Sequence, residues 1–329
     1  MTRQLAIVML AVASIFGRTA ESQRRELLYV SNEASHSISV VDTRTRSIVR
    51  TIDVGFRARG IHVSPDGTRV YVALSDDVPM KESSGDRIAV IDVTTGKLIA
   101  RYSSGSDPEQ FAVTPDGKTL YASNEDAGIA SAINLRSGKV VASTVVGIEP
   151  EGVAISPNGR WVYITAETSN TVSVIDTRTN KAVSTFLVDV RPRAAAFSPD
   201  GKRAYISAEV GGSITVVSTA TNQPIQTISL EHGEGKPVGI VVSRDGKWLY
   251  AANGRTSSVS FVNLTRNEVA ASVPVGRRPW GIALSRDGRT LYTANGLSND
   301  VSVIDIASRK VIATIKVGNR PWGLTLGYR

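Results

Sequence analysis

Short apolar stretches separated by polar turns run through the chain from residue 27 to its end, and seven of them contain a tyrosine quartet such as Tyr-Val-Ser-Asn. Successive tyrosines are 42, 50, 42, 42, 45 and 42 residues apart. Such a nearly constant spacing is typical of a repeat protein. The seven tyrosines are Tyr29, Tyr71, Tyr121, Tyr163, Tyr205, Tyr250 and Tyr292.

Each repeat predicts four short β-strands. From the second repeat on, a turn of the type SPDG, TPDG, SPNG or SRDG precedes the tyrosine strand, and its glycine is suited to a positive φ. Such a turn between two apolar runs predicts a hairpin. A third strand rich in β-branched residues follows, as in VSVID at Val172, and a fourth ends in Val-Gly, as at Gly318. Nothing after residue 20 shows a convincing helical period.

Four strands in each of seven repeats predict an all-β fold, a seven-bladed β-propeller of four-stranded antiparallel blades. The first repeat begins with its tyrosine strand, Leu27 to Asn32, and the chain ends on a lone copy of the strand that normally precedes it, Gly323 to Leu326. We therefore expect the C-terminal strand to join the N-terminal blade, which closes the ring and removes two sheet edges. A parallel β-helix would lack the hairpin turns.

The first twenty residues predict a secretory signal peptide. Arg3 precedes an apolar run from Leu5 to Phe16, which is shorter than the ~20 residues of a membrane-spanning helix. Cleavage after Ala20 is expected, although Arg18 stands where a small residue is preferred, and an uncleaved anchor is the alternative. Residues 21–329 would then be one propeller domain, periplasmic or secreted, monomeric and without membrane association.

Composition restricts the chemistry. The chain of 329 residues has no cysteine, which excludes disulfides, a cysteine nucleophile and a covalently attached c-type haem. It has three histidines and no nucleophile-elbow, zinc-protease or P-loop motif, so we expect no cofactor and no metal. The net charge of +8 favours acidic partners such as nucleic acid, anionic lipid or an acidic protein, although charge that only maintains solubility explains it as well.

The tyrosine quartets, SPDG turns, VSVID strands and VG-x-x-P-x-G links resemble the YVTN-repeat β-propellers over essentially the whole mature chain. Within that family, the sequence is most similar to secreted propellers found with PQQ-dependent alcohol catabolism. This resemblance implies a binding or accessory role, with a partner protein of a periplasmic quinoprotein dehydrogenase system. Relatives of the same shape include lactonases and haem-carrying propellers.

The loops that enter the first strand of each repeat vary most in chemistry, so we look for function there. Aligned on the proline before that strand, the flanking residues form two rings at the mouth of the central channel. Two consecutive blades contribute acids, namely Asp107, Glu109, Glu149 and Glu151. The other blades contribute Arg57, Arg59, Arg191, Arg193, Lys236, Arg278 and Arg320, together with Trp280 and Trp322.

We interpret these rings as a mouth in which a cationic arc with two indoles faces an acidic arc. Arginine forks bind carboxylate or phosphate, and indoles stack on flat ligands, so a small anionic ligand or a partner protein would bind there. The structural alternative is that the arcs pair with each other and the tryptophans fill gaps between blades. A further acidic set, Glu33, Glu125, Glu167 and Glu209, lies in four blades and is expected to be too widely spaced to share one cation.

His62 stands where the other repeats carry Ala, Val or Thr, so it is expected to line the channel. With Arg59 and Arg193 it forms the best available set for a lactonase-like hydrolase, which is the alternative to non-catalytic binding. Electrostatic binding of single-stranded nucleic acid is a further alternative, which the acidic arc disfavours. Whether the protein is an enzyme stays open, and binding without catalysis is preferred.

Overall fold

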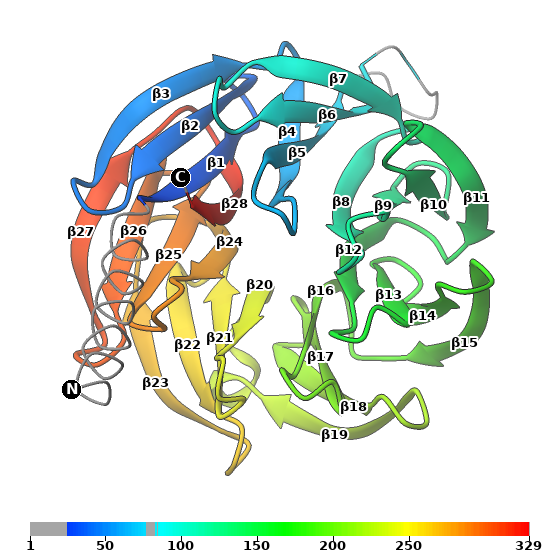
Figure 1. Cartoon of the computed structure of the whole chain (residues 1–329). Coiled ribbons are helices and arrows are strands. Elements are labelled where there is room, and N and C mark those ends of the chain that lie inside the picture. Colours follow the sequence, from blue (N-terminus) through cyan, green and yellow to red (C-terminus); the bar gives the residue numbers. More distant parts are fainter. Residues whose placement is uncertain (1–24, 77–82, 84, 329) are drawn as a thin grey trace, which may run out of the picture.

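The computed structural model describes residues 25–76, 83 and 85–328, and the predicted signal peptide, residues 1–20, lies outside them. The described residues form seven four-stranded antiparallel sheets around a central axis (Figure 1). The predicted seven-bladed propeller is therefore confirmed. The one helical element among them is a single 3-10 turn, η1 (Glu231–Gly233). In this part of the chain, no helix has the length and apolar character needed to cross a membrane.

The first strand of each blade lies nearest the axis, and the next three follow outward. The innermost strands are β4 (Arg57–Val63), β8 (Pro108–Val113), β12 (Pro150–Ile155), β16 (Pro192–Phe197), β20 (Pro237–Val242), β24 (Pro279–Leu284) and β28 (Pro321–Tyr328). The second strands carry the tyrosines and are β1 (Glu26–Asn32), β5 (Arg69–Ser75), β9 (Thr119–Asn124), β13 (Trp161–Ala166), β17 (Arg203–Ala208), β21 (Trp248–Asn253) and β25 (Thr290–Asn295).

The third strands are β2 (Ser37–Asp42), β6 (Arg87–Asp92), β10 (Ile129–Asn134), β14 (Thr171–Asp176), β18 (Ser213–Ser218), β22 (Ser258–Asn263) and β26 (Asp300–Asp305). The outer strands are β3 (Ser47–Asp53), β7 (Leu98–Ser103), β11 (Lys139–Val145), β15 (Lys181–Leu187), β19 (Gln223–Ser229), β23 (Glu268–Pro274) and β27 (Lys310–Lys316).

The C-terminal strand closes the ring as expected. In the sheet β28-β1-β2-β3, β28 pairs antiparallel with β1, and Tyr29 lies opposite Thr325 (Figure 1). The two ends of the domain thus share one blade, so separating this blade would require breaking its internal β-ladder as well as its contacts with both neighbours.

Apolar side chains of the second and third strands pack between adjacent blades in seven separate clusters. The seven repeat tyrosines are all at most 4% exposed, and some connect blades directly. The Tyr163 hydroxyl, for example, donates to Asn222 Oδ1 in the next blade at 2.7 Å. The repeated tyrosine is therefore an inter-blade core residue rather than a ligand.

Glycine on the innermost strands lets neighbouring blades approach each other. A Cβ atom built on Gly239 would lie 2.4 Å from the backbone oxygen of Trp280 in the next blade. Four other inner strands carry glycine at the same place, which explains the P-x-G part of the repeat. These positions are Gly60, Gly152, Gly281 and Gly323.

Because consecutive strands are antiparallel, the connections fall on two opposite faces. The mouth face carries the loops that enter each first strand and those that join second to third strands. The turn face carries the turns that join first to second and third to fourth strands. On the turn face, the SPDG segment forms the predicted hairpin: Gly67 has φ +72° and its N–H donates to the Ser64 carbonyl oxygen at 2.8 Å.

Candidate functional site

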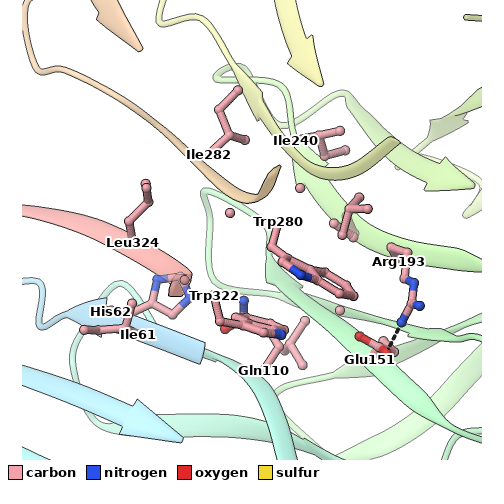
Figure 2. Close-up of a pocket in the computed structure, with 18 residues that line it drawn as sticks. Ile61, His62, Gln110, Glu151, Arg193, Ile240, Trp280, Ile282, Trp322 and Leu324 are labelled. Carbon is pink, nitrogen blue, oxygen red and sulfur yellow. Dashed lines mark hydrogen bonds and ion pairs between the residues drawn. The ribbon is translucent and has the colours of Figure 1, made fainter. Parts of the chain in front are cut away.

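A cavity of about 170 Å³ lies on the propeller axis, and all seven innermost strands contribute to its wall. Small apolar side chains and glycines form much of this wall, so the few large polar or aromatic side chains define its chemistry. Figure 2 shows them around one space: His62, Gln110, Glu151, Arg193, Trp280 and Trp322.

The two indoles stack against each other. Their ring centroids are 6.2 Å apart and their planes differ by 17°, so Trp280 and Trp322 lie at the neighbouring positions that the alignment gave them (Figure 2). The Arg278 guanidinium lies 4.5 Å from the Trp280 ring centroid, and that of Arg193 lies 5.5 Å from it. The wall therefore offers aromatic surface next to two cations, a combination suited to a flat or ring-shaped anion.

Arg193 is buried at the centre of one ion-pair network. Its Nη1 pairs with Glu151 (Figure 2). The same nitrogen pairs with Glu167, and Nε donates to Glu209 Oε2 at 2.9 Å. Although desolvation alone would lower it, the three carboxylates raise the pKa of Arg193. Among the described residues, none of these ion pairs uses Nη2, and Arg193 is one of the side chains that line the cavity.

Glu209 is fully buried and joins further arginines to this network. Arg278 Nη1 lies 3.0 Å and Arg255 Nε 3.1 Å from its Oε1, and Arg191 Nε lies 3.6 Å from its Oε2. Desolvation opposes ionisation, but Arg193 and its neighbours lower the pKa of Glu209. Glu209 therefore stays an anion and holds Arg193 and Arg278 in place.

Arg59 is the centre of a second network on the opposite side of the mouth. It pairs with Glu109, with Glu33 at 3.3 Å, with Glu125 at 3.4 Å and with Asp107 at 3.6 Å. Glu33 also pairs with Arg57 at 3.4 Å and with Arg320 at 3.6 Å. The cationic and acidic arcs thus do not face each other as open surfaces, because ion pairs connect them as in the structural alternative.

The second acidic set takes part in these same networks. Glu33 and Glu125 share Arg59, whereas Glu167 and Glu209 share Arg191 and Arg193, so the four carboxylates belong to two separate groups. The two remaining mouth residues of the alignment lie near the surface and make local contacts. Glu149 accepts from the Thr168 hydroxyl, and Lys236 Nζ donates to the Gly233 carbonyl oxygen at 2.7 Å.

Burial raises the pKa of three of these carboxyl groups. Desolvation, followed by the nearby Asp107, raises the pKa of Glu125 to about 7. Desolvation raises the pKa of Glu167 to about 7 as well, against the opposing effect of Arg193. Desolvation also raises the pKa of Glu151, again opposed by Arg193. A carboxylate of this kind can accept a proton at neutral pH more readily than an ordinary one.

His62 lines the cavity, but the set predicted around it is only partly assembled. Arg193 lines the same cavity, whereas Arg59 is absent from its wall and belongs to the second network. Desolvation lowers the pKa of His62 to about 4, although a hydrogen bond with Gln110 opposes this. The imidazole also packs edge-on against Phe111, with centroids 5.1 Å apart. His62 is therefore a neutral hydrogen-bonding group at physiological pH.

Gln110 is a cavity residue that the sequence analysis missed. It occupies the place where five other blades carry glycine and one carries Ala194, so it is the only large side chain at that place. This exception to the repeat was a usable signal. Gln110 lies between the residue that follows the proline and the position equivalent to His62, which are the places of the predicted site residues on this strand.

One group of carboxylates has metal-ligand spacing in the described part of the chain. Oxygen atoms of Asp107, Glu109 and Glu125 lie within 4.8 Å of one another. Arg59 Nη1 pairs with all three, so a guanidinium already supplies the positive charge there. The group therefore fits an internal ion pair better than a bound cation.

Comparison with known proteins assigns the chain to a family. The family model described as "Lactonase, 7-bladed beta-propeller" matches residues 19–144 and 189–314. The chain belongs to this family. Among curated proteins, Antigen Lp49 of Leptospira interrogans serogroup Icterohaemorrhagiae serovar copenhageni (strain Fiocruz L1-130) is 36% identical over 75 residues. That match covers 23% of this chain and 16% of the relative, so it spans a small part of either protein.

Solved structures share the fold along most of the chain. A chain of Kuenenia stuttgartiensis hydrazine synthase gives a TM-score of 0.76 at 24% identity and covers 85% of this chain and 92% of that one. A protein described as a putative 6-phosphogluconolactonase from Bacteroides uniformis ATCC 8492 gives a TM-score of 0.76 at 20% sequence identity. The match covers 92% of this chain and 99% of that one. A second protein described in this way, from Bacteroides fragilis NCTC 9343, gives a TM-score of 0.74 at 18% sequence identity, and the match covers 92% of this chain and 98% of that one. At these identities, the similarity establishes the fold alone.

In this lactonase-family propeller, the axial cavity brings together four kinds of group. A buried carboxylate, Glu151, can move a proton, and the Arg193 guanidinium can stabilise developing negative charge. The neutral His62 can orient a ligand through a hydrogen bond, and the stacked indoles can hold a ring. The networks around Arg193 and Arg59 fix the charged groups in position.

Proposed function

We propose that this protein is a hydrolase that opens small lactones in the axial cavity. The observation that carries the proposal is the buried Glu151–Arg193 pair beside the stacked Trp280 and Trp322, in a chain of the lactonase propeller family. A proton acceptor can activate water, a fixed cation can stabilise the negative charge that develops on the carbonyl oxygen, and the indoles can hold the lactone ring.

The proposed reaction adds water across the ester bond of the lactone ring. Glu151 accepts a proton from water, and the water oxygen forms a bond to the carbonyl carbon. Arg193 donates from Nη2 to the carbonyl oxygen, where negative charge develops in the tetrahedral intermediate. The ring C–O bond then breaks, and the proton on Glu151 passes to the departing oxygen, which gives a hydroxy acid.

The cavity also suggests a class of substrate. One face of a sugar-derived lactone can pack on the indoles, while His62 and Gln110 supply hydrogen bonds from another part of the wall. Arg278 lies beside Trp280, where it would favour a substrate that carries a negative group. The two Bacteroides proteins described as putative 6-phosphogluconolactonases support sugar-acid lactones, with or without a phosphate, as the first compounds to test.

Hydrolysis of a lactone panel by the purified chain, followed by proton release, tests the proposal. Glu151→Gln keeps the size of the side chain and removes the proton acceptor, so we expect kcat/KM to fall roughly 10²- to 10⁴-fold. Glu268→Gln, an exposed change on the turn face, is the matched control and should leave kcat/KM unchanged. Absence of hydrolysis by the folded wild type, or full activity of Glu151→Gln, would reject the proposal.

The accessory role in PQQ-dependent alcohol oxidation stays a prediction, and one observation keeps it testable. The indole pair with Arg278 and Arg193 suits any flat anion, and PQQ is one. A ligand that binds the native state raises the melting temperature. If the chain has no lactonase activity, and PQQ raises the melting temperature of the wild type but not of Trp280→Ala, binding would be favoured over catalysis.

A further inference from the structure

The two faces of the propeller carry opposite net charge. Between the strands of the turn face, the chain has fourteen lysines and arginines and five acidic residues, a net charge of +9. The described loops between the strands of the mouth face have six lysines and arginines and twelve acidic residues, a net charge of −6. The turn-face segments are 43–46, 64–68, 93–97, 114–118, 135–138, 156–160, 177–180, 198–202, 219–222, 243–247, 264–267, 285–289 and 306–309.

The charges of the turn face also differ in the contacts that they make. Its five acidic residues are aspartates bound to their own turns: Asp200, for instance, accepts from the Ser198 hydroxyl at 2.6 Å and from the Lys202 N–H at 3.0 Å. The other four make the same two contacts. All fourteen cations are exposed, as are the five aspartates. The aspartates stabilise their turns through these hydrogen bonds. Four of the cations pair with nearby carboxylates, and the excess of cations gives the face its positive charge.

The cations surround the whole face instead of following a groove. Each of the seven blades contributes at least one of them, because every blade ends in the same turns. One hollow of about 690 Å³ in this face, between two adjacent blades, is lined by three cations and no acid: Arg69, Lys118 and Arg136. A ring of positive charge with a recess lined by cations is complementary to a broad, planar partner that carries many phosphate groups.

We propose that the turn face binds the surface of an anionic phospholipid bilayer. Lysines and arginines near a negatively charged leaflet each contribute to binding without insertion, and the recess at Arg69, Lys118 and Arg136 can receive a lipid phosphate. The described chain also enters the domain at this face, since β1 starts there. Docking in this orientation directs the mouth and its axial cavity away from the bilayer.

A polyanionic strand such as nucleic acid fits the same face less well. Single strands bind through aromatic side chains on which bases stack. The two tryptophans near this face are half-buried, and arginines cover them: Arg160 lies 4.2 Å from the Trp161 centroid and Arg309 5.8 Å from that of Trp248. The proposal differs from the expectation of no membrane association, which rested on removal of the signal peptide and not on how charge is divided between the two faces.

Sedimentation with lipid vesicles tests the proposal. The chain from residue 21, which contains all 28 strands, is mixed with phosphatidylcholine vesicles with and without 30% phosphatidylglycerol, at about 50 and 300 mM NaCl. We expect binding only to the anionic vesicles, weaker at the higher salt concentration because exposed charges are screened. Arg136→Glu with Lys202→Glu should lower the partition coefficient roughly tenfold or more.

A matched pair of substitutions at the other end of the molecule controls for the change in total charge. Arg277→Glu with Lys316→Glu makes the same change in net charge at exposed positions near the mouth face, and should reduce binding far less. Circular dichroism establishes that both double variants are folded. Equal losses in the two pairs, equal binding to both vesicle types, or binding to single-stranded DNA but not to vesicles would each overturn the proposal.

Discussion

The two ends of this propeller are made by the same repeat, yet they differ in how their polar groups are used. On the turn face, nearly every blade repeats one contact, a Ser or Thr hydroxyl bound to the Asp or Asn two residues later. On the mouth face, the blades differ, and ion pairs centred on Arg59 and Arg193 join side chains of different blades. Local contacts thus specify the fold, whereas contacts between blades create the chemistry.

The largest effect is expected where a mouth-face network loses its centre. Arg193→Met removes the cation that Glu151, Glu167 and Glu209 share and leaves buried carboxylates with too little positive charge. We expect the free energy of unfolding to fall by about 3–5 kcal/mol at pH 7, measured by urea denaturation. Lys202→Met on the turn face is the control and should change it by less than ~0.5 kcal/mol. Similar losses in both would remove the distinction between the two ends.

Glycine is expected to be needed for different reasons on the inner strands and in the turns. Gly239→Ala on the axis places a Cβ against the Trp280 backbone, and we expect a loss of about 1–3 kcal/mol from this clash. Gly67→Ala in a turn meets no atom within 4 Å, but the positive φ costs about 1–2 kcal/mol.

Asparagine separates the two causes. Because asparagine tolerates positive φ, Gly67→Asn should recover part of the stability lost in Gly67→Ala. Gly239→Asn should be at least as unstable as Gly239→Ala, since the larger side chain meets the same backbone. Thermal unfolding of the four variants measures both comparisons, and recovery at both places would contradict the steric explanation for Gly239.

A smaller effect is expected from the repeated turn contact. Ser198→Ala removes the hydroxyl that donates to Asp200 and that accepts from the Arg203 N–H at 3.0 Å, so we expect a loss of about 1 kcal/mol. Ser198→Thr should be nearly neutral, because Thr114 makes the same contacts in another blade. Loss of stability in the threonine variant would show that the packing around the turn matters more than its hydrogen bonds.

A dependence on pH has opposite signs at the two ends. The pKa of Glu125 is about 7 in the folded protein and 4.5 without the fold's influence, so the folded state binds more protons. The stability from this group is complete below pH 4.5 and is lost as the pH rises through 7. Glu125→Gln should therefore flatten the stability curve over this range, as measured by thermal unfolding between pH 4.5 and 8.

The turn face supplies the contrasting case. The Ser198 hydroxyl and the Lys202 N–H lower the pKa of Asp200 from 3.8, so its contribution is present above that value and is lost as the pH falls below it. Asp200→Asn should leave the curve between pH 4.5 and 8 unchanged. An equal flattening by Asp200→Asn and Glu125→Gln would mean that the slope has another origin.

The strands, turns and ring closure were predictable from the sequence because each depends on a short, repeated pattern. The alignment also predicted that Trp280 and Trp322 are neighbours, since equivalent residues of adjacent blades lie side by side. The pairing of charges was not predictable in the same way. Arg59 and Arg193 look alike in the alignment, yet only Arg193 lines the cavity with His62.

By itself, the sequence determined the number of blades, their strand order and the closure of the ring, because the same local hairpin pattern occurs in all seven repeats and fixes how each blade folds. Only the tertiary structure decided which carboxylate meets which arginine around Arg59 and Arg193. Those contacts join residues of different blades, so they depend on distances across the ring that no local pattern contains.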